Sequence, residues 1–127
     1  MSPASAIAAS GVVAAALKLG ASAANLANVS DTAKVGGKPA FNPLGVENAP
    51  LPEGGVAASV VTLSPGQTLA FDPTSALTDA QGLVQAPEID PAAEVSNQLL
   101  ARQAFAFSLE ALKVAGETQR TLLNIKV

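Results

Sequence analysis

The sequence contains no cysteine, no histidine and no tryptophan, and only 3% of its 127 residues are aromatic. Without cysteine and histidine, disulfides, thiol chemistry, the usual zinc ligand sets and a histidine general base are all excluded. Charged residues make up 13% of the chain with a net charge of −3, which gives no basic patch for nucleic acid and no polybasic membrane anchor. We therefore expect a protein that is not an enzyme, holds no cofactor or metal, and binds no nucleic acid.

Hydrophobic residues reach 49% of the chain, but alanine supplies much of that share. A fully buried Leu, Ile or Phe contributes roughly 1.5–3 kcal/mol, and alanine contributes far less. A monomer of this composition offsets the loss of backbone entropy poorly. Small residues do let helices approach closely, so we expect a chain that is stabilised mainly by packing against other chains.

The apolar run Ile7–Leu17, followed by the small residues Ala21–Ala23, is similar to a cleavable leader. The basic segment that precedes the apolar run of a signal peptide is missing, because the first basic residue, Lys18, follows the run. The run is also too short and too rich in alanine to span a bilayer. We prefer a helix that stays in the mature protein, with no direct membrane span. A cleaved leader on a secreted or periplasmic binding module is the alternative.

The chain divides into three segments that we expect to form one structural unit: an N-terminal helix in 1–28, an excursion of loop and short strands in 29–89, and a C-terminal helix in 90–127. Ser2 is a favourable N-cap for the first helix, and Pro3 suits its first position. One narrow face of that helix carries mostly small residues at three- and four-residue steps, namely Ile7, Gly11, Ala14, Leu17, Ala21, Ala24 and Asn28.

Prolines and Gly-Gly pairs interrupt any helix in the middle segment. Val56–Leu63 is rich in valine and bounded by glycine and proline, as a short strand should be. Thr68–Phe71 is a second candidate strand, and Asp79–Gly82 is a turn before Leu83 and Val84. The segment is predicted to be a long loop with a few short strands.

The C-terminal segment gives the strongest helical pattern. Asp90 is a favourable N-cap, Pro91 suits the first helical position, and Glu94 places negative charge near the positive end of the helix, which is predicted to reach Ile125. Its apolar stripe, interrupted by the polar residues 116–119, consists of Val95, Leu99, Phe105, Leu109, Leu112 and Leu123. The predicted fold class is mainly α: two long terminal helices that pair as an antiparallel coiled coil, with a Pro/Gly-rich middle segment carrying a few short β-strands.

Carboxylates are the only numerous candidates for catalysis. Glu88, Asp90 and Glu94 are close in sequence, but acids at a helix N-terminus are what the helix dipole favours. Three further acids stand in turn contexts without the spacing of a calcium loop, namely Asp31, Asp72 and Asp79. Gly36–Lys38 lacks the remainder of a phosphate-binding loop and is predicted to be a turn. A small hydrolase is therefore the weakest alternative.

Phe105 and Phe107 are two residues apart and cannot lie on one helix face. We expect one of them to enter the helix pair and the other to face a loop or a neighbouring subunit. Arg102 lies on the apolar stripe of the last helix. It either extends its charge outward from the edge of the stripe or pairs with an acid on an adjacent subunit.

Segments at both ends of the chain resemble known sequence motifs. Ala21–Ser30 (ASAANLANVS) resembles the SAxNLAN signature of flagellar rod and hook proteins, and Phe71–Pro73 resembles a Y-x-P element of that family. Asp79–Asp90 (DAQGLVQAPEID), followed by a helix that ends in Leu122–Ile125, resembles the DxxGYVxxPNVD element of the proximal-rod FlgC type. The chain is therefore similar, at its N-terminus and over its last sixty or so residues, to flagellar basal-body rod proteins.

This resemblance implies a structural subunit of the periplasmic rod, exported unfolded by the flagellar export apparatus and polymerised with copies of itself and other rod subunits through its terminal helices. Asn25 and Asn28 would close the first helix by bonding backbone groups at its end. A distal-rod or hook protein is the alternative within the same class. The residues expected to pack between subunits are Ile7, Ala14, Leu17, Ala21, Asn25, Asn28, Val95, Leu99, Arg102, Phe105, Leu109, Leu112 and Leu123.

Overall fold

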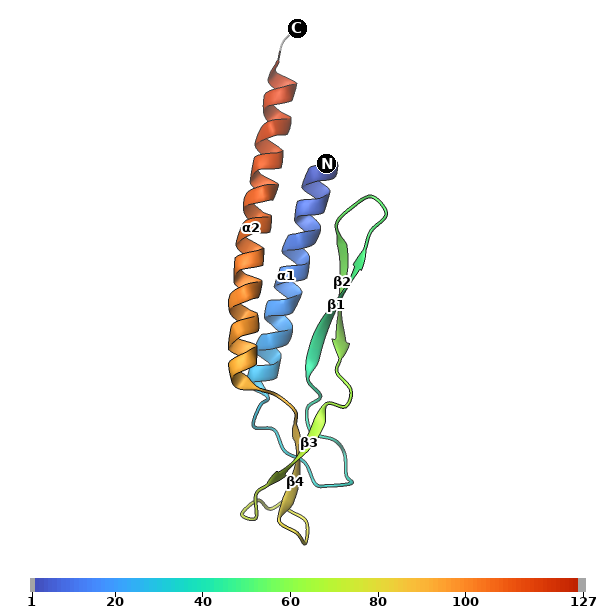
Figure 1. Cartoon of the computed structure of the whole chain (residues 1–127), viewed down its shortest axis with the longest axis vertical. Coiled ribbons are helices and arrows are strands. Elements are labelled where there is room, and N and C mark those ends of the chain that lie inside the picture. Colours follow the sequence, from blue (N-terminus) through green and yellow to red (C-terminus); the bar gives the residue numbers. More distant parts are fainter. Residues whose placement is uncertain (1, 126–127) are drawn as a thin grey trace.

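The computed structural model describes residues 2–125 and contains two helices and four strands. In chain order these are α1 (Pro3–Ala27), β1 (Leu44–Pro50), β2 (Val56–Thr62), β3 (Gln67–Phe71), β4 (Leu83–Pro87) and α2 (Pro91–Asn124). Met1 and residues 126–127, at the outer ends of the two expected helical segments, lie outside the described residues. The molecule is elongated: the helices form one part and the second small sheet extends beyond their joined end (Figure 1).

The predicted fold class is wrong. Helices hold 48% of the described residues and strands 20%, in two antiparallel sheets of two strands each, so the fold mixes helices with sheets and is not a long-helix coiled coil. The helices do run side by side in opposite directions (Figure 1). A coiled coil needs large apolar side chains that enter holes on the facing helix. Here Ala101 is the one residue of α2, within the described range, that is fully buried, while Val95, Leu99 and Leu109 are about half exposed or more.

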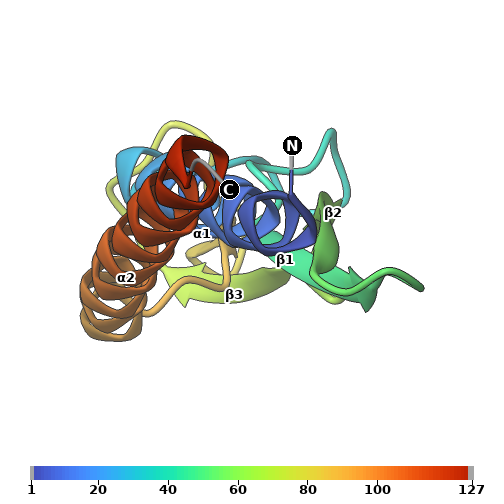
Figure 2. The same ribbon diagram turned by 90° about the horizontal axis from the view of Figure 1, so that it is seen from above.

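Helix α1 lies in the middle of the helical part. It packs against α2 on one side and against β1 and β2 on the other, as the view from above shows (Figure 2). This position explains the composition of α1, because small side chains let a helix pack closely against neighbours on both sides. Its buried residues are Ser5, Ala8, Ala14, Ala15, Ala21, Ser22 and Asn25.

The first sheet is a hairpin in which Leu44 pairs with Thr62 and Pro50 pairs with Val56. The prediction of a strand over Val56–Leu63 is confirmed by β2, whereas β1 was missed. The sequence of β1, LGVENAP, contains glycine, glutamate, asparagine and proline, which are all poor strand formers. Its extended form therefore depends on its pairing with β2 and on its anchorage to α1, described below.

The second sheet pairs β3 with β4, from Gln67–Pro87 at one end to Phe71–Leu83 at the other. Val84 of β4 is 1% exposed. The segment after α1 returns along β4, where Ala33 and Gln85 exchange two backbone hydrogen bonds of 2.8 Å. The strand predicted near Thr68–Phe71 is confirmed, and the turn predicted before Leu83 leads into β4 as expected.

The helix termini follow the sequence signals. Ser2 caps α1 by accepting a hydrogen bond from the Ser5 amide, and Asp90 caps α2 by accepting from the amides of Ala92 and Ala93. The helix predicted to reach Ile125 is confirmed to Asn124, and the polar residues 116–119 lie within it.

Candidate functional site

Three elements meet at one buried side chain, Asn25, in the last turn of α1. Asn25 is 1% exposed, and its amide oxygen accepts a hydrogen bond of 2.8 Å from the Leu44 amide of β1. Its amide nitrogen donates to the Leu44 carbonyl and to Oε1 of Glu94 in α2, both at 2.9 Å. Ser22, one turn earlier, donates from Oγ to the Glu94 carbonyl at 2.9 Å. We call these four residues the Asn25 junction.

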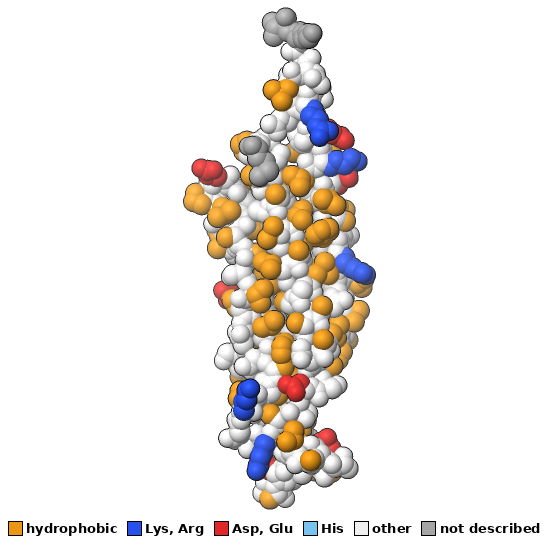
Figure 3. Space-filling view, turned by 180° about the vertical axis from the view of Figure 1, so that it is seen from behind, with side chains coloured by type: hydrophobic (Ala, Val, Ile, Leu, Met, Phe, Trp, Pro, Cys, Tyr) orange, Lys and Arg blue, Asp and Glu red, His pale blue; other side chains and the backbone are white. Residues whose placement is uncertain are grey.

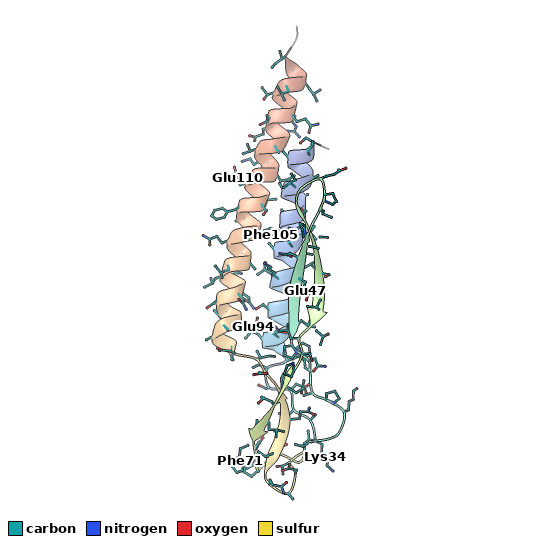
Figure 4. The ribbon with its side chains drawn as sticks, turned by 45° about the vertical axis from the view of Figure 1, so that its right-hand side comes forward. Lys34, Glu47, Phe71, Glu94, Phe105 and Glu110 are labelled. Carbon is teal, nitrogen blue, oxygen red and sulfur yellow. The ribbon has the colours of Figure 1, made fainter. Side chains whose placement is uncertain are left out.

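Asparagine suits this position because its side-chain amide has an oxygen that accepts and a nitrogen that donates. It satisfies the N–H and the C=O of Leu44, which stand at the start of a strand. Glu94 stands in the first turn of α2, at the base of the helix pair (Figure 4). The junction therefore fixes the position of both helices and the hairpin relative to one another.

Asn28 has the role that was expected for both asparagines. It is the C-cap residue of α1, and its side chain donates to the Ala24 carbonyl at 2.8 Å. Asn25 differs from that expectation because its partners lie 19 and 69 residues away and not at the helix end.

The two helices approach each other closely at Gly11. A Cβ atom on Gly11 would lie 2.6 Å from Oγ of Ser108 in α2, so the interhelical distance here depends on the absence of a side chain. Small residues at contact positions permit this approach. The close packing explains why the residues that α1 buries are alanine, serine and asparagine.

The acids have structural positions. Asp90 caps α2, Glu94 belongs to the Asn25 junction, and Glu88 is exposed. Asp72 and Asp79 bond the backbone of their own turns, as predicted, and Asp31 accepts from the more distant Phe41 amide at 2.7 Å. Within residues 2–125 no group of three or more acids is placed to hold a metal ion. The predicted turn at Gly36–Lys38 is confirmed by a Gly37 to Lys34 backbone bond and a φ of 75° at Gly36.

The residues expected to pack between subunits fall into two groups. Some are turned into the chain's own interior or partly covered by it, namely Ala14, Leu17, Ala21, Asn25, Asn28, Phe105 and Leu112. The others are exposed, namely Ile7, Val95, Leu99, Arg102, Leu109 and Leu123. Contact of either group with another subunit stays a prediction. Only the exposed residues are accessible to a neighbouring subunit without rearrangement of the chain.

Apolar residues that do not belong to the predicted stripe of α2 line an open groove. At the outer end of the helix pair, a hollow of about 750 Å³ is bordered by Ala4 of α1 and by Phe107, Ala111, Val114 and Leu122 of α2. A second hollow shares Ala4, Phe107 and Ala111 with it and adds Ile7 and the hairpin residue Val56. Their signal in the sequence was a separate run at three- and four-residue steps from Leu100 to Val114.

Apolar surface is abundant beyond this groove. Within the described part of the chain, seventeen large hydrophobic residues are well exposed, while Val84 is the one large hydrophobic side chain that is fully buried. From behind, apolar side chains cover much of the long middle of the molecule, and charged groups lie mainly at its edges and ends (Figure 3). Continuous exposed apolar surface on a protein usually marks a contact with another molecule.

Helix α1 is long and apolar enough to cross a membrane by length and composition alone, with a mean hydropathy of 1.6 over its best eighteen-residue window. The shorter run considered in the sequence understated this property. Buried helices of water-soluble proteins and signal sequences have the same property, so length and hydropathy do not decide between them. In this structure α1 is covered by α2 on one side and by the hairpin on the other.

No protein-family model and no curated protein matches the sequence, so the surface geometry and the terminal motifs are what a functional proposal has to rest on.

Proposed function

We propose that this chain is a structural subunit of the bacterial flagellar basal-body rod, in the periplasm, and that it assembles with copies of itself and with other rod subunits. It carries no catalytic role in this proposal. The export apparatus of the flagellum is its partner before assembly.

The observation that carries the proposal is the distribution of apolar surface. Seventeen exposed large hydrophobic side chains against one buried one, among the described residues, is the reverse of what a self-sufficient globule needs. Burying each such side chain in a contact contributes roughly 1.5–3 kcal/mol if it is fully covered. A subunit that gains much of its stability from neighbours accounts for this distribution.

The motif residues support the proposal because they hold structural positions. Of the N-terminal motif, Asn25 forms the junction and Asn28 caps α1. Of the C-terminal motif, Asp79 accepts from the amides of Gln81 and Leu83, and Asp90 caps α2. A motif made of such anchors is what a family of architectural proteins would retain.

The test is deletion of the gene in the bacterium that encodes the chain, scored by swimming in soft agar and by mass spectrometry of purified basal bodies. The expected result is loss of swimming, with restoration by the intact gene and recovery of the chain from basal bodies. Unchanged swimming together with absence of the chain from basal bodies would refute the proposal. Recovery from hook fragments and not from rods would favour the hook or distal-rod alternative.

Arg102 gives a residue-level test. It is exposed, and no ion pair to it is found within residues 2–125. If Arg102 pairs with an acid of an adjacent subunit, Arg102→Ala should lower incorporation into basal bodies without changing the thermal midpoint of the isolated chain. Arg120→Ala on the same helix is the matched control, because Arg120 is also exposed and lies outside the expected packing set. Equal loss with both variants would argue against a specific pair.

A secreted or periplasmic binding module with a cleaved leader is the second candidate, favoured by the apolar length of α1. Cleavage after Ala23 would remove most of α1, leave Asn25 without its helix and uncover the hairpin, so the remaining fold would lose its central layer. Mass determination of the mature protein decides between the two: a mass that includes residues 2–23 supports the rod subunit, and a mass that lacks them supports the module.

A further inference from the structure

A second apolar seam runs along the side of α2 that borders the open hollows between α2 and α1. It consists of residues at alternating four- and three-residue steps, the spacing of a heptad seam, namely Leu100, Ala104, Phe107, Ala111, Val114 and Thr118. All six are exposed, and the three large ones are 65%, 67% and 51% exposed for Leu100, Phe107 and Val114. Ala101, the buried residue of α2, does not belong to the seam.

Large and small side chains alternate along this seam. Leu100, Phe107 and Val114 occupy one heptad position, and the small residues Ala104, Ala111 and Thr118 occupy the other. Facing helices pack best where a large residue on one meets a small residue on the other. The seam is therefore a surface whose best partner has the same pattern in the opposite order.

We propose that this seam binds the same seam of a second copy, with the two α2 helices antiparallel about a two-fold axis. In that arrangement Phe107 of one copy faces Ala111 of the other, Val114 faces Ala104, and Leu100 faces Thr118. Each contact occurs twice, as a two-fold interface requires. A parallel pairing in register would instead place Phe107 against Phe107 and Ala111 against Ala111. The two phenylalanines would then crowd each other, and the two alanines would leave a gap between the helices.

The residues that extend and flank the seam fit the same arrangement. Asn97 and Thr121 continue the spacing at its two ends, and the antiparallel order places them opposite each other, where an amide and a hydroxyl form a hydrogen bond. Glu110 flanks Ala111 near the axis, where it approaches its own copy. The repulsion between the two Glu110 carboxylates is reduced by Lys113 of the same helix, whose Nζ lies 3.8 Å from Oε1 of Glu110.

The interface is small. Three large side chains per copy, partly covered already, fall short of the roughly 800 Å² per partner of a standard stable interface. We expect a reversible dimer with a dissociation constant on the order of 10–100 μM. The inference concerns the unassembled chain and stands whether or not the chain joins a flagellar rod.

Sedimentation equilibrium of the full chain between about 5 and 500 μM tests the association. The expected result is a monomer–dimer equilibrium that Ala111→Asp weakens at least tenfold. The matched control is Ala106→Asp, an identical exchange at an exposed position of α2 outside the seam, which should leave the equilibrium unchanged. Far-UV circular dichroism checks that both variants keep the helical content of the parent chain. Glu110→Gln should strengthen the dimer, since it removes the repulsion near the axis.

Cysteine cross-linking tests the orientation, because the chain contains no cysteine of its own. Ala104→Cys and Val114→Cys chains are oxidised separately and as a mixture. The antiparallel arrangement predicts a disulfide-linked dimer mainly in the mixture, between position 104 of one copy and 114 of the other. Dimers that form equally well in each variant alone would show a different alignment and overturn the proposal.

Two further results would also overturn it: a chain that is monomeric at 500 μM, or a dimer that both Ala→Asp variants weaken to the same degree. Neither bears on the rod proposal, which is measured by swimming and by the composition of basal bodies.

Discussion

Replacement of Asn25 by alanine is expected to be the most damaging single change in the helical part of the molecule. The variant removes both bonds to Leu44 and the bond to Glu94 from a side chain that is 1% exposed. A buried polar group left without a partner costs about 1–3 kcal/mol. Leu44 loses partners for both its N–H and its C=O, and it is half-buried, so we expect a total loss of about 2–4 kcal/mol.

The assay is urea unfolding followed by far-UV circular dichroism. For a small protein the free energy of unfolding falls by about 1–3 kcal/mol per molar urea, so the midpoint should fall by roughly 1–2 M. Asn28→Ala is the matched control, three residues later in the same turn. It removes one bond to the Ala24 carbonyl at a half-buried position, which is worth about 0.5–1.5 kcal/mol.

A double-mutant cycle separates the contribution of Glu94. Glu94→Gln keeps a side-chain oxygen that accepts from Asn25, and it leaves the Ser22 bond to the Glu94 backbone in place. Its effect should therefore be small, and it should vanish in the Asn25→Ala background. The reasoning about the junction fails if Asn25→Ala lowers the midpoint no further than Asn28→Ala does.

Three other changes give separate tests. Gly11→Val should destabilise the chain by about 1–3 kcal/mol in urea unfolding, because its side chain meets Ser108, and Ser108→Gly should restore part of the loss; no loss would contradict the close helix approach. Val84→Ala should cost about 1–3 kcal/mol by thermal unfolding, since it leaves a cavity at the best-buried large side chain, whereas Leu69→Ala at a 57% exposed site should cost much less. Leu109→Pro should lower the helical content by circular dichroism and abolish swimming, because proline inside a helix costs about 3 kcal/mol or more; normal swimming would refute the need for an unbroken α2.

The local features of this fold were predictable from the sequence. Ser2 and Asp90 marked the helix starts because capping depends on side chains within a few residues. β2 was predictable from its valines, but β1 was not, because its residues adopt an extended form only through contacts with β2 and Asn25. Propensity alone carries no information about such distant partners.

The arrangement of the helices was not predictable in the same way. Periodicity locates apolar positions but does not say which face of α2 meets α1. The face that does so contains Ala101, whose small side chain gives a weak hydrophobic signal, whereas the larger Val95 and Leu99 of the predicted stripe are exposed. The role of Asn25 was mistaken for the same reason: its distant partners lie 19 and 69 residues away, beyond the range of any local pattern.

The separation of Asn25 from Glu94 along the chain also has a temporal consequence. A polypeptide that emerges N-terminus first presents all of α1 before either neighbouring layer exists. The hairpin arrives next and supplies Leu44, but the last partner of the junction is missing until residue 94 has emerged. Contacts between residues so far apart form late, because the intervening loop must close first. The helical layer thus remains open for most of the time the chain takes to appear, and its closure waits for the first turn of α2.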